Sequence, residues 1–266
     1  DAVNPGGRIP RRRFLQGVGA SVLAGLGGAQ VIRLGAEAGQ SAPELPATRQ
    51  RWALVIDLRR CDGCKKCTQA CQAMHHTPEG VEWIKVYTLT NAAGGPYYLP
   101  RVCMQCENAP CYEVCPVGAT FYAPDGVVLI DQDRCIGCRL CMVACPYGAR
   151  YFTWDDPPPV DPAQLDGESG PEFPVPQQKG TVSKCVLCVH RLREGKLPAC
   201  VEACTMEAIY VGDWEADLAT NGRETVQLSR FLKENDAFRL KEELNTRPRV
   251  WYIAGHGQDL EYKYSL

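Results

Sequence analysis

The cysteines constrain the fold of this 266-residue chain more than any other feature, because all sixteen of them fall into four groups of four. Within a group, neighbouring cysteines are separated by two to four residues, apart from one gap of eleven in the last group. We call these groups sets one to four: Cys61, Cys64, Cys67 and Cys71; Cys103, Cys106, Cys111 and Cys115; Cys135, Cys138, Cys141 and Cys145; Cys185, Cys188, Cys200 and Cys204. No cysteine is left over, so the fold must bring these thiols together in groups of four.

The spacing within the sets indicates iron–sulfur clusters. Sets one and three have the run C-x2-C-x2-C-x3-C, which is typical of bacterial ferredoxins that bind [4Fe–4S] clusters. Set two has two extra residues before its third cysteine, and set four has a longer middle. Three thiolates this close together can surround one cubane from a single loop, and Gly63 and Gly137 supply the backbone freedom that such a loop needs.

Two other uses of cysteine fit the sequence less well. A disulfide framework does not repeat a cluster-binding run four times. A structural zinc site fits set four taken alone, because that set has two cysteine pairs separated by a finger-like stretch. Zinc does not suit sets one and three, since a mononuclear site has no use for three closely spaced thiolates and a fourth directed elsewhere. We therefore expect all sixteen cysteines to bind iron.

The last cysteine of each set predicts how the sets pair. It begins a short helix that leads away from its own loop, so it ligates the cluster of a partner set. Sets two and three are joined by nineteen residues, and residues 119–131 contain two β-rich runs around Pro124-Asp125-Gly126, which is typical of a hairpin. Sets two and three therefore pair, and sets one and four pair by elimination. Proline follows the last cysteine in sets two and three only.

Four cluster sites follow from this pairing, named sites A to D. Site A is Cys61, Cys64, Cys67 and Cys204; site B is Cys71, Cys185, Cys188 and Cys200; site C is Cys103, Cys106, Cys111 and Cys145; site D is Cys115, Cys135, Cys138 and Cys141. The fold class that follows is α+β and loop-rich, with two interleaved units that each resemble a bacterial ferredoxin with two [4Fe–4S] clusters. The outer unit takes residues 51–102 and 181–215, and the inserted unit takes residues 103–154.

The N-terminal 38 residues resemble an export signal. Arg11-Arg12-x-Phe14-Leu15 is followed by an apolar stretch rich in glycine and alanine, as in twin-arginine signals. The resemblance implies that the protein crosses the membrane already folded, with every thiol held by iron, and faces the periplasmic or extracytoplasmic side of the cytoplasmic membrane. Ala36-Glu37-Ala38 looks like a cleavage site, whereas residues 14–32 are long enough to stay as an uncleaved membrane anchor, so both outcomes remain open.

Local patterns predict the structure of the rest of the chain. Residues 39–50 form a linker, residues 155–180 form a proline-rich strap that lies against a partner subunit or acts as a solvated spacer, and residues 216–266 form a helical and strand extension. We expect helices of this extension to cover the outer cluster pair. His75 and His76 follow a complete set of ligands, so we expect them at the surface or in an interface. A buried strand is predicted at residues 52–58, and further strands at residues 81–90, 119–122, 150–154, 208–211 and 250–253.

Composition limits the function. The 29 basic and 31 acidic residues nearly balance, so there is no basic face for nucleic acid. The sequence contains no nucleophile arrangement, no nucleotide-binding loop and no flavin fingerprint, so we expect no catalytic site. Four oxidised cubanes with thiolate ligands would add roughly −8 to the formal charge of −2. Clusters without a reaction centre predict a path for electrons.

The four sets, together with Cys115-Pro116-Val117-Gly118-Ala119, Cys145-Pro146-Tyr147-Gly148-Ala149-Arg150 and residues 229–235, resemble one family. It is the four-cluster iron–sulfur subunit family of dimethyl-sulfoxide-reductase-type (complex iron–sulfur molybdoenzyme) systems, with relatives in polysulfide, tetrathionate and cytochrome-linked nitrite reductases, sulfite-reduction-associated complexes and alternative complex III. The resemblance implies four [4Fe–4S] clusters and two partners: a quinone-reactive multi-pass membrane subunit, and a molybdopterin catalytic subunit or a multihaem cytochrome c. A free exported polyferredoxin shuttle and a zinc-stabilised adaptor are the alternatives from other classes.

Overall fold

The structure is a computed structural model that describes residues 50–91, 93–157, 159–161 and 176–255, all within one compact unit of residues 45–266. The expected export signal or anchor (residues 1–38), nearly all of the linker and most of the proline-rich strap lie outside the described residues. Within the described part of the chain, no helix has both the length and the apolar character needed to span a bilayer.

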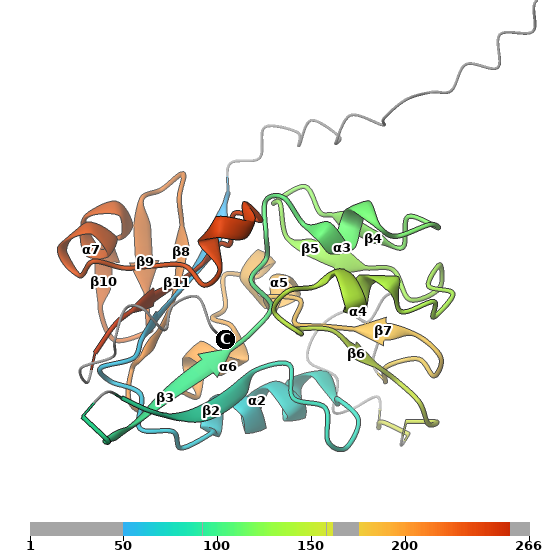
Figure 1. Ribbon diagram of the computed structural model, residues 1–266, viewed down its shortest axis with the longest axis horizontal. Helices are drawn as coiled ribbons and strands as arrows, with labels where there is room; N and C mark the ends of the chain where they lie inside the picture. The colour runs from blue at the N-terminus through green and yellow to red at the C-terminus, as the bar shows by residue number, and fades with distance from the viewer. Residues whose placement is uncertain (1–49, 92, 158, 162–175, 256–266) are drawn as a thin grey trace, which may run out of the picture. The chain divides into compact units, whose positions relative to one another are not determined.

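A five-stranded sheet with the order β10-β9-β8-β1-β11 carries both ends of the described chain (Figure 1). Its strands are β1 (Trp52–Asp57), β8 (Ile209–Asp213), β9 (Leu218–Thr220), β10 (Thr225–Gln227) and β11 (Val250–Ile253). β1 pairs antiparallel with β8 and parallel with β11, so the strand leading into set one lies beside the strand that follows set four. The expected strands at residues 52–58, 208–211 and 250–253 are therefore confirmed.

Side chains alternate across β1, and this alternation divides the core in two. Leu54 and Ile56 belong to the large hydrophobic cluster that also contains the cysteines. Ala53 and Val55 face a second cluster, which helix α7 (Leu228–Glu234) closes with its own apolar residues. The expectation that the C-terminal helices cover the outer cysteine sets is therefore wrong for α7, because its apolar side chains bury against the sheet face that bears no cysteine.

Among the described residues, the remaining strands form three two-stranded antiparallel ribbons (Figure 1). They are β2 (Lys85–Thr90) with β3 (Pro96–Arg101), β4 (Thr120–Tyr122) with β5 (Val128–Ile130), and β6 (Tyr151–Phe152) with β7 (Val182–Ser183). The β4–β5 ribbon confirms the hairpin expected between sets two and three. The strand expected at residues 81–90 begins only at Lys85.

The helices are short, and most of them carry cysteines. They are α2 (Lys66–His75), α3 (Pro110–Glu113), α4 (Leu140–Ala144), α5 (Val189–Arg193), α6 (Ala199–Glu202) and α7, with a 3-10 turn η2 (Glu242–Leu244). α2 packs against α6, and α3 packs against α4. The fold is thus mixed α and β and loop-rich, as the sequence predicts, and its helix pairs join set one to set four and set two to set three.

Candidate metal centres

All sixteen cysteines are described, and none of them forms a disulfide. Seven of them are buried, and only Cys64 and Cys138, the second residues of sets one and three, are exposed. A buried thiol with several other thiols around it is a strong donor for a soft metal, because thiolates bind iron and zinc strongly. The neighbours of each thiol therefore decide which groups could hold a cofactor.

Cys204 of set four lies beside the first loop of set one. Burial raises the pKa of the Cys67 thiol to about 12, and negative charge on Cys204 and Cys61 contributes to this rise. The pKa of Cys61 is likewise raised by burial first, and then by Cys204 and Cys64 among other neighbours. The structure therefore brings together the four cysteines of site A.

Cys71 lies close to the first three cysteines of set four, namely Cys185, Cys188 and Cys200. Burial raises the pKa of Cys71 well above its usual value, and the sulfurs of Cys185, Cys188 and Cys200 raise it further. These four cysteines are those of site B. The first three cysteines of set one and its last cysteine thus serve different groups, because α2 carries Cys71 one helical turn beyond Cys67.

The inserted unit repeats this exchange. Burial raises the pKa of Cys106, with contributions from Cys103, Cys111 and Cys145, which are the cysteines of site C. Burial also raises the pKa of Cys141, and the sulfurs of Cys135 and Cys115 add to it, as expected for site D. The last cysteine of set two therefore lies with the cysteines of set three, and the last cysteine of set three lies with those of set two. The packing of α3 against α4 brings them there.

Neighbouring sites also interact with each other, and these interactions give their order. Cys67 of site A contributes to the raised pKa of Cys200 in site B, after burial and the other thiols of site B. Cys103 of site C contributes, after burial, to raising the pKa of Cys185 in site B to about 12. The guanidinium of Arg150 interacts with the sulfurs of Cys111 in site C and Cys141 in site D. The sites therefore follow one another as A, B, C and D.

The donor sets fit iron–sulfur clusters better than single metal ions. Among the described residues, no three histidine, cysteine or acidic side chains converge on a point that could hold one metal ion. A structural zinc ion needs four donors at about 2.3 Å from one centre. In a cubane each iron takes one cysteine, so the ligands surround a volume rather than a point. Set four also lacks the closed arrangement of a zinc finger, since Cys204 lies with set one.

Backbone amides are ready to stabilise thiolates at these sites. The amides of Leu187 and Ala208 donate to the sulfurs of Cys185 and Cys204 at 3.3 Å. Burial acts to raise the pKa of Cys115, but hydrogen bonds from backbone amides, that of Thr120 first, outweigh it and lower the pKa. At the fully buried cysteines burial dominates instead, so binding of iron must displace their protons.

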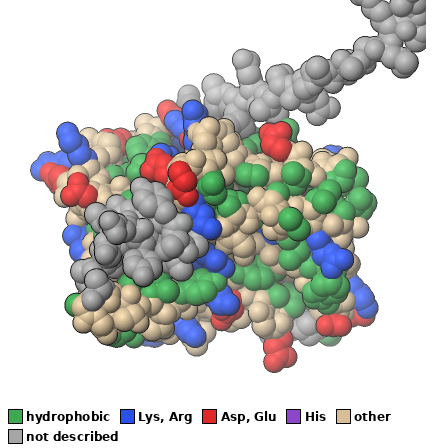
Figure 2. Space-filling model, viewed as in Figure 1, with side chains coloured by type: hydrophobic (Ala, Val, Ile, Leu, Met, Phe, Trp, Pro, Cys, Tyr) green, Lys and Arg blue, Asp and Glu red, His purple; other side chains and the backbone are tan. Residues whose placement is uncertain are grey.

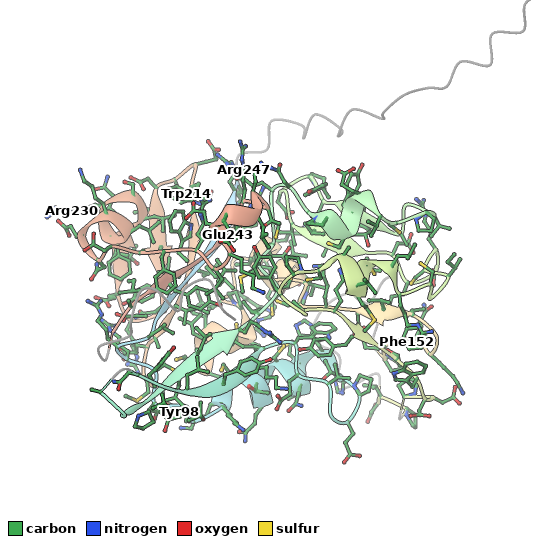
Figure 3. The ribbon with its side chains drawn as sticks, viewed as in Figure 1. Tyr98, Phe152, Trp214, Arg230, Glu243 and Arg247 are labelled. Carbon is green, nitrogen blue, oxygen red and sulfur yellow. The ribbon has the colours of Figure 1, made fainter. Side chains whose placement is uncertain are left out.

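The loops of sets one and three have the same backbone conformation. Gly63 and Gly137 have φ of 76° and 67°, and Lys65 and Arg139, which precede the helices, have φ of 59° and 62°. Both glycines are also closely approached: a Cβ at Gly63 would lie 2.3 Å from the ring of Tyr98, and one at Gly137 would lie 2.1 Å from the carbonyl oxygen of Gly180. Tyr98 comes from β3 (Figure 3). The role expected for these two glycines is confirmed.

One histidine lies next to a predicted ligand that it was not expected to reach. His75 is buried, and its Nε2 atom lies 3.2 Å from the sulfur of Cys188. Burial, with a contribution from positive charge on His190, lowers the pKa of His75 to about 3, so the ring is neutral. The expectation of a surface position is therefore wrong for His75. Helical periodicity would have revealed it, because His75 lies four residues after Cys71 on α2.

Two buried basic residues were also missed as site residues. Arg150 and Lys184 are 4% and 2% exposed, and both lie beside cysteines. Lys184 directly precedes Cys185, and Arg150 follows Cys145 by five residues. Since their positions relative to the sulfurs depend on how the ribbons pack, the spacing of the cysteines carries no signal for them.

Known proteins support an iron–sulfur function. A family model described as a 4Fe-4S dicluster domain matches residues 96–157 and 173–214. The chain is 39% identical to a selenate reductase subunit of Mesobacillus selenatarsenatis, an alignment covering 78% of this chain and 73% of that protein. It is 36% identical to a tetrathionate reductase subunit of Salmonella typhimurium, covering 91% of this chain and 87% of that protein. It is also 36% identical to "Menaquinone reductase, iron-sulfur cluster-binding subunit" of Nitratidesulfovibrio vulgaris, covering 77% and 89%.

The fold and the cysteine groups thus define a protein that binds [4Fe–4S] clusters. The chain belongs to the family of iron–sulfur subunits of molybdoenzyme-type reductase complexes. Such subunits transfer electrons and are distinct from the catalytic subunits, so the expectations for the family, the cofactor and the general electron-transfer role are confirmed. The assignment of individual cysteines to clusters stays a prediction.

Proposed function

We propose that this chain relays electrons through four [4Fe–4S] clusters, one at each of sites A to D, inside a membrane-bound oxidoreductase complex. The observation that carries the proposal is the arrangement of the sixteen cysteines in four neighbouring groups, each containing a cysteine from a partner set. When bound, the clusters supply one-electron chemistry, and the chain supplies thiolates, amide hydrogen bonds and exclusion of water.

The proposal includes two interleaved ferredoxin-like units. The outer unit contains sites A and B and the helix pair α2–α6, and the inserted unit contains sites C and D and the helix pair α3–α4. The β1–β8 pairing supports the outer unit, because it joins the strand before set one to the strand after set four. The β4–β5 ribbon supports the inserted unit, because it connects sets two and three directly.

The two ends of this series of sites have different surfaces, which supports contacts with two different partners. Near site D, Ile136, Leu140, Val143 and Trp154 are exposed, with Val143 at 87% and Trp154 at 62%. Figure 2 shows hydrophobic side chains on the face that bears the inserted unit. Near site A the loop of set one instead exposes Lys65 and Lys66. A group of exposed apolar side chains such as this one marks a surface that another protein covers.

We place the complex on the extracytoplasmic side of the cytoplasmic membrane, between a quinone-reactive membrane subunit and a molybdopterin or multihaem cytochrome subunit. The twin-arginine pattern at residues 11–15 supports the side of the membrane. The names of two relatives support a link to quinone, namely a menaquinone reductase subunit and "Hdr-like menaquinol oxidoreductase iron-sulfur subunit 1" of Archaeoglobus fulgidus, 34% identical. A soluble shuttle would lack both partners.

The cofactor content tests the proposal directly. Anaerobically purified protein is expected to contain about sixteen irons and as many labile sulfides per chain, at four irons per cluster. Cys204→Ser should remove the signal of site A and leave the iron of site B, whereas loss of the site B signal would refute the pairing. Thr205→Ser is the matched control, because it changes the neighbouring residue and keeps its hydroxyl. Zinc in place of iron would favour the adaptor.

The partners are tested on the native assembly. Val143→Glu is expected to weaken co-purification with a membrane subunit or an enzyme subunit, while Leu244→Glu, which changes another exposed apolar residue, serves as the control. Retention of the protein in the membrane fraction until detergent is added supports the complex. A monomer that stays soluble without detergent, and that both variants leave unchanged, would support the free shuttle instead.

A further inference from the structure

Two positive charges are buried among sites B, C and D. Arg150 is 4% exposed and Lys184 is 2% exposed. In the part of the chain that the structure describes, neither of them forms a salt bridge with a carboxylate, although burying a charge without a partner is costly. Both of them instead interact electrostatically with cysteine sulfurs.

Arg150 lies between sites C and D. Its Nη1 donates to the hydroxyl of Thr120 at 3.1 Å, and the amide of Thr120 lies 3.5 Å from the sulfur of Cys115 in site D. Its Nη2 is buried without a hydrogen-bond partner among the described residues. Burial would lower the pKa of Arg150, but negative charge on Cys111, Cys141 and Cys103 outweighs burial and raises it. The guanidinium is thus within electrostatic reach of both sites.

Lys184 lies between sites B and C. Its ammonium group donates to the carbonyl oxygen of Cys185 at 2.9 Å and to that of Val128 in β5. Its charge acts on Cys185 of site B and on Cys111 of site C. Cys111 is therefore the thiol that both cations reach, because Arg150 acts on it as well.

We propose that Arg150 and Lys184 are buried cations that raise the reduction potentials of the clusters beside them. Arg150 acts on the clusters at sites C and D, and Lys184 acts on those at sites B and C. This inference rests on the proposed function, since it requires clusters at these sites. One electron passes to a cluster from its neighbour, which loses that electron, and no bond forms or breaks. Because the acceptor gains negative charge, a fixed cation stabilises its reduced form more than its oxidised form.

The buried position makes this effect local. Charges in a dry interior are screened little by salt, and an arginine keeps its proton at every pH at which the protein is folded. Site C lies beside both cations, whereas site A lies beside neither. The arrangement therefore predicts a pattern across the four sites rather than a uniform shift.

The test is an anaerobic redox titration followed by electron paramagnetic resonance, on the whole complex or on the full chain. Cys204→Ser assigns the site A signal by its loss, and Cys145→Ser assigns that of site C. Arg150→Met is expected to lower the midpoint potentials of sites C and D, and Lys184→Met those of sites B and C. Arg150→Lys should restore most of the wild-type potentials. Site A should respond to neither change.

Arg249→Met is the matched control. Arg249 is a buried cation at 5% exposed, but the charged groups that act on it most strongly are Glu107 and Arg51 rather than cysteines. It should leave all four potentials in place even if it destabilises the fold. Equal shifts of the midpoint potentials in all three methionine variants would overturn the inference. Unchanged midpoint potentials in both Arg150→Met and Lys184→Met would overturn it as well.

The outcomes separate this inference from the proposed function. A wild-type protein that contains far fewer than about sixteen irons contradicts the proposed function itself. If the protein contains all its iron but its midpoint potentials are the same in Arg150→Met and Lys184→Met as in wild type, only the role of Arg150 and Lys184 is contradicted. If Arg150→Met fails to fold, Lys184→Met decides, since a shift confined to sites B and C supports the inference and any other pattern refutes it.

Discussion

Gly137 occupies the point where the loop of set three passes closest to another backbone segment. Its φ of 67° lies in the left-handed region, and a Cβ there would lie 2.1 Å from the carbonyl oxygen of Gly180 and 3.1 Å from the ring of Phe152. Gly118, which follows the last cysteine of set two, has a similar φ of 63° but no atom within 4 Å of an added Cβ. The pair Gly137→Ala and Gly118→Ala therefore separates backbone strain from steric collision.

The magnitudes follow from these two contributions. A left-handed conformation costs a non-glycine residue about 1–2 kcal/mol, partly offset by about 0.4–1 kcal/mol from the reduced freedom of the unfolded chain. Gly118→Ala should thus destabilise the protein by about 1 kcal/mol. Gly137→Ala adds a collision with backbone, which cannot rotate away as a side chain can, at about 1–3 kcal/mol. Its total destabilisation should be about 2–4 kcal/mol.

The assay is thermal unfolding of the cluster-loaded proteins under anaerobic conditions at one scan rate, together with iron counts. At about 2–4 °C per kcal/mol for a domain of this size, Gly118→Ala should lower Tm by about 2–4 °C and Gly137→Ala by about 4–16 °C. Gly137→Ala should also lose iron from site D first. Equal Tm values for the two variants would show that the approach of Gly180 is not a constraint, and would refute the reasoning.

Three other expectations can be checked on the same preparation. Asp217 accepts hydrogen bonds from the amide and the hydroxyl of Ser229 at 2.7 and 2.8 Å, and these bonds lower its pKa. Asp217→Asn should therefore lower Tm at neutral pH, where the carboxylate is ionised. An unchanged Tm at neutral pH would contradict this. Tyr252→Phe should cost about 1–3 kcal/mol in chemical denaturation, since it removes the donor to the carbonyl oxygen of Pro100 at 3.0 Å in a fully buried site; a change below about 0.5 kcal/mol, on the order of a surface substitution, would argue against it. Removal of iron by a chelator should unfold α2 and α4, seen as lost amide protection, because metal-binding energy is folding energy in such segments; full protection in the iron-free protein would count against this.

Much of the fold was accessible from local patterns. The strands β1, β8 and β11 are short, apolar runs, two of them next to cysteine sets, and the β4–β5 ribbon follows from its turn residues. The apolar runs and turn residues are local patterns and therefore predict where these elements lie, although β1 pairs with strands far away in the chain. The strand β6 was less predictable in its role, because its partner β7 lies beyond the proline-rich segment.

The position of α7 could not be predicted from local sequence patterns. Its apolar residues predict a helix, but they do not reveal which face of the sheet it covers. The alternation along β1 makes both faces apolar, so only the packing decided that Leu228 and Leu232 join Val55 rather than the cysteines. A one-residue change in the register of β1 would have exchanged the two faces.

The spacing of the cysteines by itself determined the cofactor class and the loops that need Gly63 and Gly137, and it predicts the exchange of ligands between sets. It could do so because three thiols in one short loop have few ways to point at a common centre. The tertiary structure alone decided which distant groups face the sulfurs: the ring of His75 at Cys188, and the guanidinium of Arg150 and the ammonium of Lys184 at Cys111. Those contacts join segments far apart in the chain, and short-range spacing holds no information about how distant ribbons pack.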